Sequence, residues 1–171
     1  MIAAIIGSTK IAKIHYENLV KLNYKKIYFI SRNKSRAKNF IKNNIEGTKL
    51  CEPENYRILR KLKFDIIVNC TNTEFHYESI KLIQNNQKFL IIEKPLISSI
   101  KFKKNYLKVL NKIYKNQKNL IVCYPMLFLG KSFLKNFSYL KKVKKLKIYY
   151  FTNGKHKYEK ICEDLLPHGY S

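Results

Sequence analysis

The chain contains no tryptophan and only two methionines, and in 171 residues it has just five glycines and four prolines. So little glycine and proline excludes a collagen-like repeat and a low-complexity linker. No apolar run approaches the ~18 residues that a membrane span needs. The N-terminal stretch "MIAAIIGSTK" has no basic leader, and its apolar run is shorter than that of a secretory signal. We therefore expect a cytoplasmic protein with no membrane partner.

Cysteine is scarce and irregularly spaced. The four cysteines form no C-x-x-C pair and show no metal-like spacing, so we expect no metal site. They are typical of small buried hydrophobic residues in a reducing compartment. These cysteines are Cys51, Cys70, Cys123 and Cys162.

Acidic residues are also few, because 11 Asp and Glu stand against 35 Lys and Arg, which gives a formal net charge of +24. Such a charge commonly indicates a nucleic-acid partner. Here most basic residues are lysines spread over the whole chain, together with the Ile, Asn, Tyr and Phe that A/T-rich codons favour. A nucleic-acid site would need a basic stripe with interleaved aromatic residues. We favour solvated surface lysines and predict no nucleic-acid partner.

Short apolar runs alternate with amphipathic stretches along the chain, and no internal repeat is present. Several runs are apolar throughout, which is typical of parallel strands covered by helices on both faces. The pattern predicts an α/β fold with a doubly wound, Rossmann-like parallel sheet over residues 1–124 and an incomplete C-terminal α+β segment over 125–171. The predicted strands are 2–6, 26–31, 48–51, 65–70, 89–93, 120–124 and 145–151.

Helical spacing links apolar residues between these runs. Ile80 and Ile83 predict one buried helix face. A first helix is predicted from Ile11, Ile14, Leu19 and Leu22, and a longer one from Phe102, Leu107, Leu110, Ile113 and Tyr114.

The stretch "GSTKIAKIH", from Gly7 to His15, follows the first strand. A glycine turn that opens a helix places free N–H groups and the positive end of the helix dipole toward an anion, as in pyrophosphate sites. Against the pattern G-x-G-x-x-G/A, Gly7 and Ala12 hold the outer positions, with Lys10 and Ile11 between. Thr9 replaces the middle glycine, so an ordinary strand-to-helix turn remains the alternative reading.

The second strand ends in Ser31 and Arg32, where an NAD site usually has an acidic residue for the ribose 2′-hydroxyl. Without that carboxylate, Arg32 could pair with a 2′-phosphate. The cofactor prediction is therefore NADP or NAD, with NADP favoured. The alternative is that Arg32 is a surface arginine.

Two further motifs follow predicted parallel strands. "NCTNTEFH" brings Thr71, Asn72 and His76 to the end of one strand, and "FLIIEKPLISS" brings Glu93 and Lys94 to the end of the next. Doubly wound sheets bind their ligands at these carboxyl ends.

Together, "AAIIGSTKIAKIH", "DIIVNCTNTEFHYESI" and "FLIIEKPLISS" resemble the N-terminal motifs of the Gfo/Idh/MocA oxidoreductases, the glucose-fructose oxidoreductase and inositol dehydrogenase family. The resemblance implies NAD(P)-dependent hydride transfer at a hydroxyl carbon of a sugar, polyol or similar small molecule. It also implies that Lys94 lies between nicotinamide and substrate, with a cis Lys94-Pro95 bond expected. In "DLLPH", Asp164 and His168 match a later catalytic motif, with His168 as acid/base. Family members commonly form homo-oligomers.

The chain departs from this family at several points. Thr9 replaces a glycine, Asn72 stands where proline is frequent, and Leu127 where arginine is common. The sequence ends at Ser171, before the large substrate domain that the family carries. We therefore keep open a non-catalytic or truncated nucleotide-binding module as the alternative to an enzyme.

Overall fold

The computed structural model describes residues 1–83, 87–98, 101–102, 104–117 and 119–123. Apart from Cys123, all of them belong to one compact unit, Met1–Val122. The predicted strand 145–151, the segment 125–171 and the candidates Asp164 and His168 lie outside the described residues.

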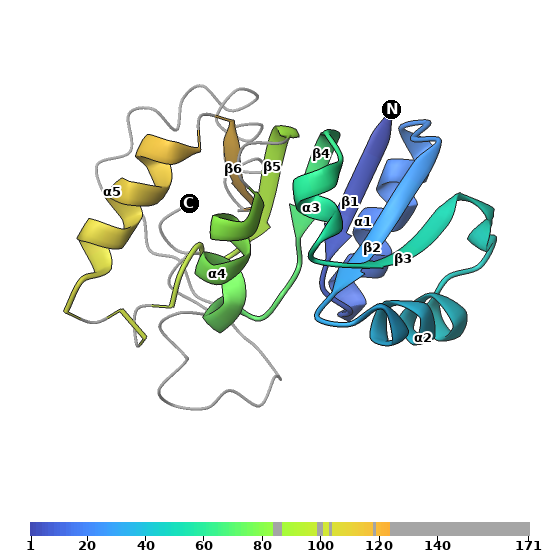
Figure 1. Ribbon diagram of the computed structural model, residues 1–171, viewed down its shortest axis with the longest axis horizontal. Helices are drawn as coiled ribbons and strands as arrows, with labels where there is room; N and C mark the ends of the chain where they lie inside the picture. The colour runs from blue at the N-terminus through green and yellow to red at the C-terminus, as the bar shows by residue number, and fades with distance from the viewer. Residues whose placement is uncertain (84–86, 99–100, 103, 118, 124–171) are drawn as a thin grey trace, which may run out of the picture. The chain divides into compact units, whose positions relative to one another are not determined.

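Strands and helices alternate along the described chain (Figure 1). The strands are β1 (Ile2–Ile6), β2 (Lys26–Ser31), β3 (Cys51–Asn55), β4 (Phe64–Asn69), β5 (Gln87–Glu93) and β6 (Leu120–Cys123). The helices are α1 (Lys10–Lys21), α2 (Lys34–Asn44), α3 (Ile58–Lys61), α4 (Thr73–Ile83) and α5 (Tyr106–Asn116), with a short 3-10 turn, η1 (Thr48–Leu50).

The six strands form one sheet in the order β3-β2-β1-β4-β5-β6. The pairings from β3 through to β5 are all parallel, and Ile5 of β1 lies between Phe29 of β2 and Val68 of β4. This is the predicted doubly wound arrangement, in which the strand order reverses between β1 and β4. Ligands of such sheets bind outside the carboxyl ends of the strands at this switch point.

Helices cover both faces of the sheet, as the uniformly apolar strands predict. One core cluster joins residues of α3, α4 and α5 to the sheet, among them Leu59, Ile80 and Ile113. The other joins α1 and α2 to the opposite face, through residues such as Tyr16 and Ile41. The buried pair Ile80 and Ile83 confirms the face predicted for α4.

The third strand differs from its prediction. The run 48–51 forms η1 and only the start of β3, which continues through Pro53 to Asn55. β3 is the last strand in the sheet order and pairs with β2. An edge strand tolerates proline and polar residues. β3 therefore contains no apolar run by which the sequence could have predicted it.

The predicted face of α1 is right at Leu19, which is buried, and at Ile11, which packs against the core, but wrong at Ile14 and Leu22. Ile14 and Leu22 are 51% and 62% exposed, while Ala12, Tyr16 and Leu19 form the buried face. The spacing of these three residues is that of a single helical stripe. In α5, Ile113 is buried as predicted, whereas Leu107 and Tyr114 are exposed. Apolar residues are so abundant in this chain that some of them occupy solvent-facing positions.

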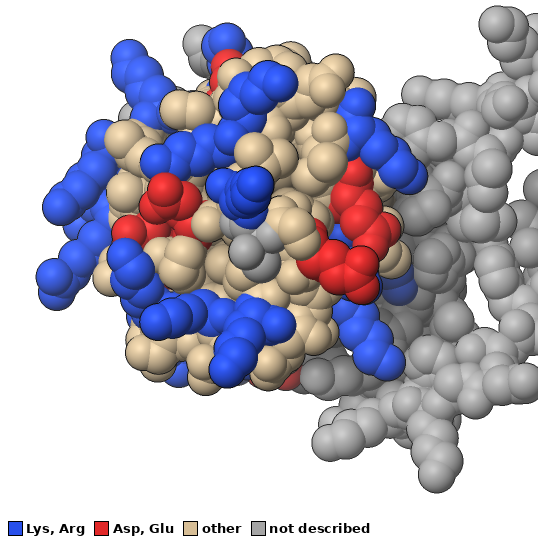
Figure 2. All heavy atoms as spheres, turned by 90° about the vertical axis from the view of Figure 1, so that its right-hand side faces the viewer, with Lys and Arg blue, Asp and Glu red and all other residues tan. Residues whose placement is uncertain are grey.

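Charged side chains are dispersed over the face shown in Figure 2, where blue Lys and Arg residues lie among red Asp and Glu residues. Ion pairs such as Lys26–Glu52 and Lys34–Glu54 draw acidic groups next to basic ones. In the part of the chain that the structure describes, no helix is long and apolar enough to cross a membrane.

Candidate functional site

The turn after β1 packs tightly against the end of β4. The Gly7 amide donates to the Ile30 carbonyl at 2.9 Å, and the Cys70 amide donates to the Ile6 carbonyl at 2.7 Å. Gly7 has a φ of +111°, and a Cβ there would lie 2.8 Å from both the backbone carbon and oxygen of Cys70. Only glycine fits this contact without backbone movement. The predicted first position of the phosphate loop is therefore a required glycine.

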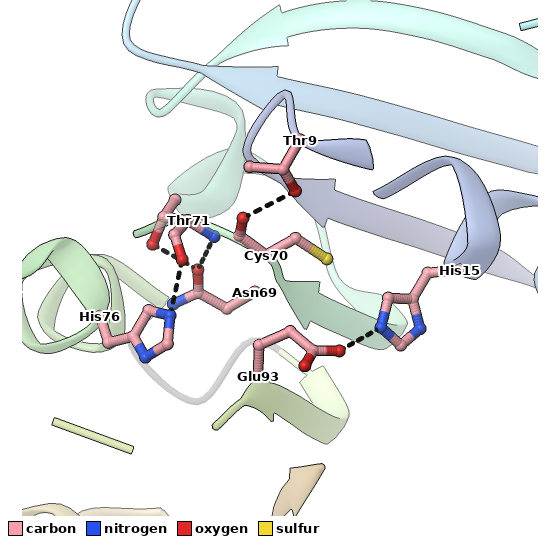
Figure 3. A network of polar contacts seen from close by, with 7 residues as sticks. All are labelled: Thr9, His15, Asn69, Cys70, Thr71, His76 and Glu93. Carbon is pink, nitrogen blue, oxygen red and sulfur yellow. Dashed lines mark hydrogen bonds and ion pairs between the residues drawn. The ribbon is translucent and has the colours of Figure 1, made fainter. Parts of the chain in front are cut away.

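Thr9, at the middle position of the motif, caps helix α1 with extended backbone angles, φ −113° and ψ 165°. Its hydroxyl donates to the Cys70 carbonyl at 3.2 Å rather than to an amide of its own helix (Figure 3). The first turn of α1 contains no acidic residue and begins with the exposed Lys10. Ala12 is fully buried against the sheet, which suits the third position of the motif. This helix end is therefore suited to an anionic group.

The end of β4 is shaped by a side chain that accepts hydrogen bonds from its own turn. The Asn69 Oδ1 atom accepts from the Thr71 amide at 3.1 Å and from the Thr71 hydroxyl at 2.8 Å. Asn69 is completely buried, so this turn is fixed from inside the sheet. Asn72 is exposed, and its carbonyl accepts from the Phe75 amide at 2.8 Å where α4 begins.

His76 joins two loops of the site. Its Nε2 atom lies 2.8 Å from the Thr71 carbonyl oxygen, and its Nδ1 atom lies 3.0 Å from the Pro95 carbonyl oxygen. A neutral imidazole donates to one of these oxygens at a time. Burial lowers the pKa of His76, although both carbonyls favour the protonated ring. With 1% exposure, His76 contributes to the site by holding the Thr71 loop beside the turn after β5.

That turn contains Glu93, Lys94 and Pro95, and the Lys94-Pro95 bond is cis, as expected. Glu93 extends toward α1, where its Oε1 atom lies 2.7 Å from Nε2 of His15. Both side chains are mostly buried, with 16% exposure for His15 and 17% for Glu93. Figure 3 shows Cys70 between this pair and the Asn69–Thr71–His76 cluster. Lys94 is partly exposed at the mouth of β5.

At the end of β2, Ser31 and Arg32 have different surroundings. Ser31 is buried, and its hydroxyl donates to the Asn33 carbonyl at 2.7 Å. Arg32 is exposed, and its guanidinium carbon lies 5.3 Å from the ring centre of Phe75 in α4. Of the two, only Arg32 presents free donors to solvent.

The structure thus brings the predicted residues of the first turn, Thr71 and Glu93 to one edge of the sheet, while Asp164 and His168 lie outside the described residues. Three contributors were missed from the sequence: His15, Asn69 and Phe75. His15 belongs to the quoted "GSTKIAKIH" and Phe75 precedes His76, so closeness to motifs was the available signal. Within the described ranges, no cluster of His, Cys, Asp and Glu could hold a metal ion.

Comparison with known proteins decides the family. A family model described as an oxidoreductase family with an NAD-binding Rossmann fold matches residues 1–124. The chain belongs to the Gfo/Idh/MocA family. This membership confirms the resemblance and the nucleotide-binding fold read from the three motifs. No curated protein sequence matches the chain.

Solved structures with the same fold include dehydrogenases. The myo-inositol dehydrogenase of Lactobacillus casei, in complex with NAD(H) and myo-inositol, has a TM-score of 0.57 at 15% identity; the match covers 80% of this chain and 42% of that one. UDP-N-acetylglucosamine 3-dehydrogenase from Acidithiobacillus ferrooxidans gives 0.56 at 13% identity, covering 80% and 42%. The transcriptional regulator Gal80p from Kluyveromyces lactis gives 0.58 at 17% identity, covering 82% and 36%. The match therefore spans less than half the length of each.

Proposed function

We propose that the chain is the cofactor-binding part of an NAD(P)-dependent oxidoreductase that transfers hydride between nicotinamide and a hydroxyl carbon of a sugar, polyol or similar compound. The observation that carries this proposal is the packing of the Gly7 turn on the backbone of Cys70, beside the turn of Glu93 and Lys94. The Gly7 turn and the first turn of α1, which contains no acidic residue, suit a pyrophosphate. Lys94 follows β5, which is the second strand from β1 in the sheet order.

Each part of the cofactor then has candidate residues. The amides of Thr9, Lys10 and Ile11, between Gly7 and Ala12, would hold the pyrophosphate, because the Gly7 and Ala12 amides already donate to the Ile30 and Thr9 carbonyls. Ser31 shapes the end of β2 through its bond to Asn33, while Arg32 would contact the adenosine 2′-phosphate. Thr71, Asn72 and Glu93 would border the nicotinamide end, with His76 holding the two loops together. NADP is the favoured cofactor because no carboxylate ends β2.

Bound nicotinamide would supply the hydride acceptor or donor. By the family pattern, Lys94 would donate a hydrogen bond to the substrate oxygen and stabilise its developing negative charge. His168 would take the hydroxyl proton as general base, with Asp164 orienting its ring. Positioning of such groups lowers barriers by about 7 kcal/mol or more. His15 would influence this site indirectly, because its Nε2 atom contacts the carboxylate of Glu93, the residue that precedes Lys94.

Turnover by the full chain tests the proposal. Residues 1–171 would be mixed with NADP or NAD and a panel of sugars, inositols and other polyols, and reduced cofactor would be followed by absorbance. Any turnover that the native chain shows is expected to be lost in both Lys94→Ala and His168→Ala, with cofactor affinity retained. Activity that is unchanged in Lys94→Ala would contradict the role of that lysine.

A non-catalytic nucleotide-binding module is the second candidate. One protein of the same fold is named as a transcriptional regulator, so the fold is not restricted to enzymes. This candidate predicts cofactor binding at the same turn without turnover of any substrate in the panel.

The proposal extends to cellular setting and assembly. Cys51 is a free thiol, which suits a reducing compartment such as the cytoplasm. A homo-oligomer fits the habit of the family, and light scattering at several protein concentrations would measure its mass.

A further inference from the structure

Arg32 and Phe75 meet across the end of β1. Arg32 follows β2 and Phe75 lies in the first turn of α4, which follows β4. β2 and β4 are the two neighbours of β1 in the sheet. Their contact, with the guanidinium carbon 5.3 Å from the ring centre, therefore lies at the edge where the Gly7 turn begins.

The position of Phe75 is set by its helix. The next residue, His76, is buried, and each of its ring nitrogens faces a backbone carbonyl oxygen. Successive helical residues point about 100° apart, so a buried His76 directs Phe75 away from the core. Phe75 is 40% exposed. Phe75 thus keeps a substantial part of its ring at the surface, where the guanidinium of Arg32 lies over it.

The acidic side chain on the strand beside the end of β2 is occupied by another partner. Glu54 lies on β3 beside the end of β2, and its Oε1 atom accepts from Lys34 at 2.9 Å. None of the ion pairs among the described residues includes Arg32. The guanidinium is thus oriented by an aromatic face while its N–H groups remain available to an anion.

We propose that Phe75 is a specificity-determining residue, which holds the guanidinium of Arg32 in the orientation that receives a 2′-phosphate. The inference rests on the proposed function, because it assigns the adenosine end of the cofactor to Arg32. A free arginine loses much rotamer freedom when it binds a phosphate, whereas a stacked one has already lost part of it. Cation–π contacts at exposed sites change an equilibrium constant by about two- to fivefold.

The test compares two nucleotides that differ only in the 2′-phosphate, adenosine 2′,5′-bisphosphate and 5′-AMP. Their dissociation constants would be measured by calorimetry on residues 1–171 at one fixed ionic strength. We expect a preference for the bisphosphate of about tenfold or more, since charge-assisted pairs are worth that much. Arg32→Ala removes this preference. Phe75→Ala reduces it about two- to fivefold.

Conservative variants separate the aromatic contact from bulk. Phe75→Tyr keeps an aromatic face and retains the preference, whereas Phe75→Leu keeps apolar volume and reduces the preference about two- to fivefold, as Phe75→Ala does. When Arg32→Ala is already present, the addition of Phe75→Ala does not further change the ratio of the two dissociation constants. Leu107→Ala removes another exposed apolar side chain, from α5, and leaves both constants unchanged.

Failure of this inference is distinguishable from failure of the proposed function. If Phe75→Ala and Phe75→Leu weaken the binding of both nucleotides equally, or of neither, the role of Phe75 is overturned. The proposal that the chain binds the cofactor is unaffected by that result. Equal affinity of the unmodified chain for both nucleotides also overturns it. No binding of either nucleotide, nor of NADH or NADPH, contradicts the proposed function itself.

Discussion

His15 of α1 and Glu93 at the end of β5 are 78 residues apart in sequence and 2.7 Å apart in space, measured between Nε2 and Oε1. The contact connects the helix whose first turn faces the proposed pyrophosphate site to the residue that precedes Lys94. Because both side chains are mostly buried, solvent screens the contact less than a surface ion pair. The pair therefore links the two halves of the site.

We expect His15→Ala to lower the free energy of unfolding by about 1.5 to 3 kcal/mol, the range for hydrogen bonds to charged groups. It also weakens NADPH binding by loosening the turn of Glu93 and Lys94. Urea unfolding and cofactor titration measure the two effects. The matched control is Lys88→Ala. Lys88 also forms an ion pair, with Asp65, but its side chain is 74% exposed. A loss no larger than in the control, which should stay under about 1 kcal/mol, would contradict this account.

Gly7→Ala should destabilise the chain and abolish cofactor binding. The new Cβ would lie 2.8 Å from backbone atoms of Cys70, and a positive φ is itself costly for alanine. We expect a loss of about 2 kcal/mol or more in unfolding free energy. Gly47→Ala is the control, because Gly47 also has a positive φ, +69°, but a Cβ added there would meet no atom within 4 Å. Its cost should be only the strain of about 1 to 2 kcal/mol, with cofactor affinity unchanged.

Thr9→Gly should tighten cofactor binding by less than about tenfold, because the backbone can approach a pyrophosphate more closely without Cβ. The loss of the hydroxyl bond to Cys70 opposes this gain, while glycine as a helix cap costs only a few tenths of a kcal/mol. Thr9→Ser keeps the hydroxyl and should bind as the native chain does. Weaker binding in the glycine variant would show that the Thr9–Cys70 bond orders the loop for the cofactor.

His76 should make stability depend on pH. Burial lowers its pKa from the ordinary value of 6.5 in the folded chain. As pH falls through about 6.5, the unfolded chain takes up a proton that the folded chain resists, so the free energy of unfolding decreases. Lowered carboxyl pKa values, as at Glu54 and Asp65, act in a more acidic range. Urea unfolding at pH 8, 7, 6 and 5 measures the slope.

A His76→Gln variant provides the comparison, since an amide can still donate to one of the two carbonyls. We expect it to be less stable at pH 8 but to lose less stability between pH 7 and pH 5 than the native chain. An identical slope in both proteins would assign the acid sensitivity to other groups.

Much of the sheet could be predicted because its central strands carry their own signal. β1, β2 and β4 are short apolar runs that are largely buried, so no polar alternation obscures them. β5 carries an apolar run as well, although Phe89 at its start is 50% exposed. β3 could not be found in this way, because its residues suit an exposed edge. The buried stripe of α1 was misread because Ile14 and Leu22 are as apolar as the residues that the sheet covers.

In the candidate site, local motifs were predictable and contacts across the fold were not. Gly7 and Lys94 follow strands directly, so position along the chain places them at the sheet edge. The partners of Glu93 and Arg32 depend on which helices meet that edge, which spacing within one motif does not encode. His15 and Phe75 therefore became visible only once the strand order was known.

Titration of residues 1–171 with NADPH and NADH, followed by cofactor fluorescence, measures whether this sheet edge binds a dinucleotide. We expect saturable binding of at least one cofactor, stronger for NADPH, that disappears in Gly7→Ala and persists in Gly47→Ala. Circular dichroism of the variants would establish that each remains folded. Absence of binding by the folded native chain, or equal binding by a folded Gly7→Ala variant, would contradict the assignment of this sheet edge as a dinucleotide site.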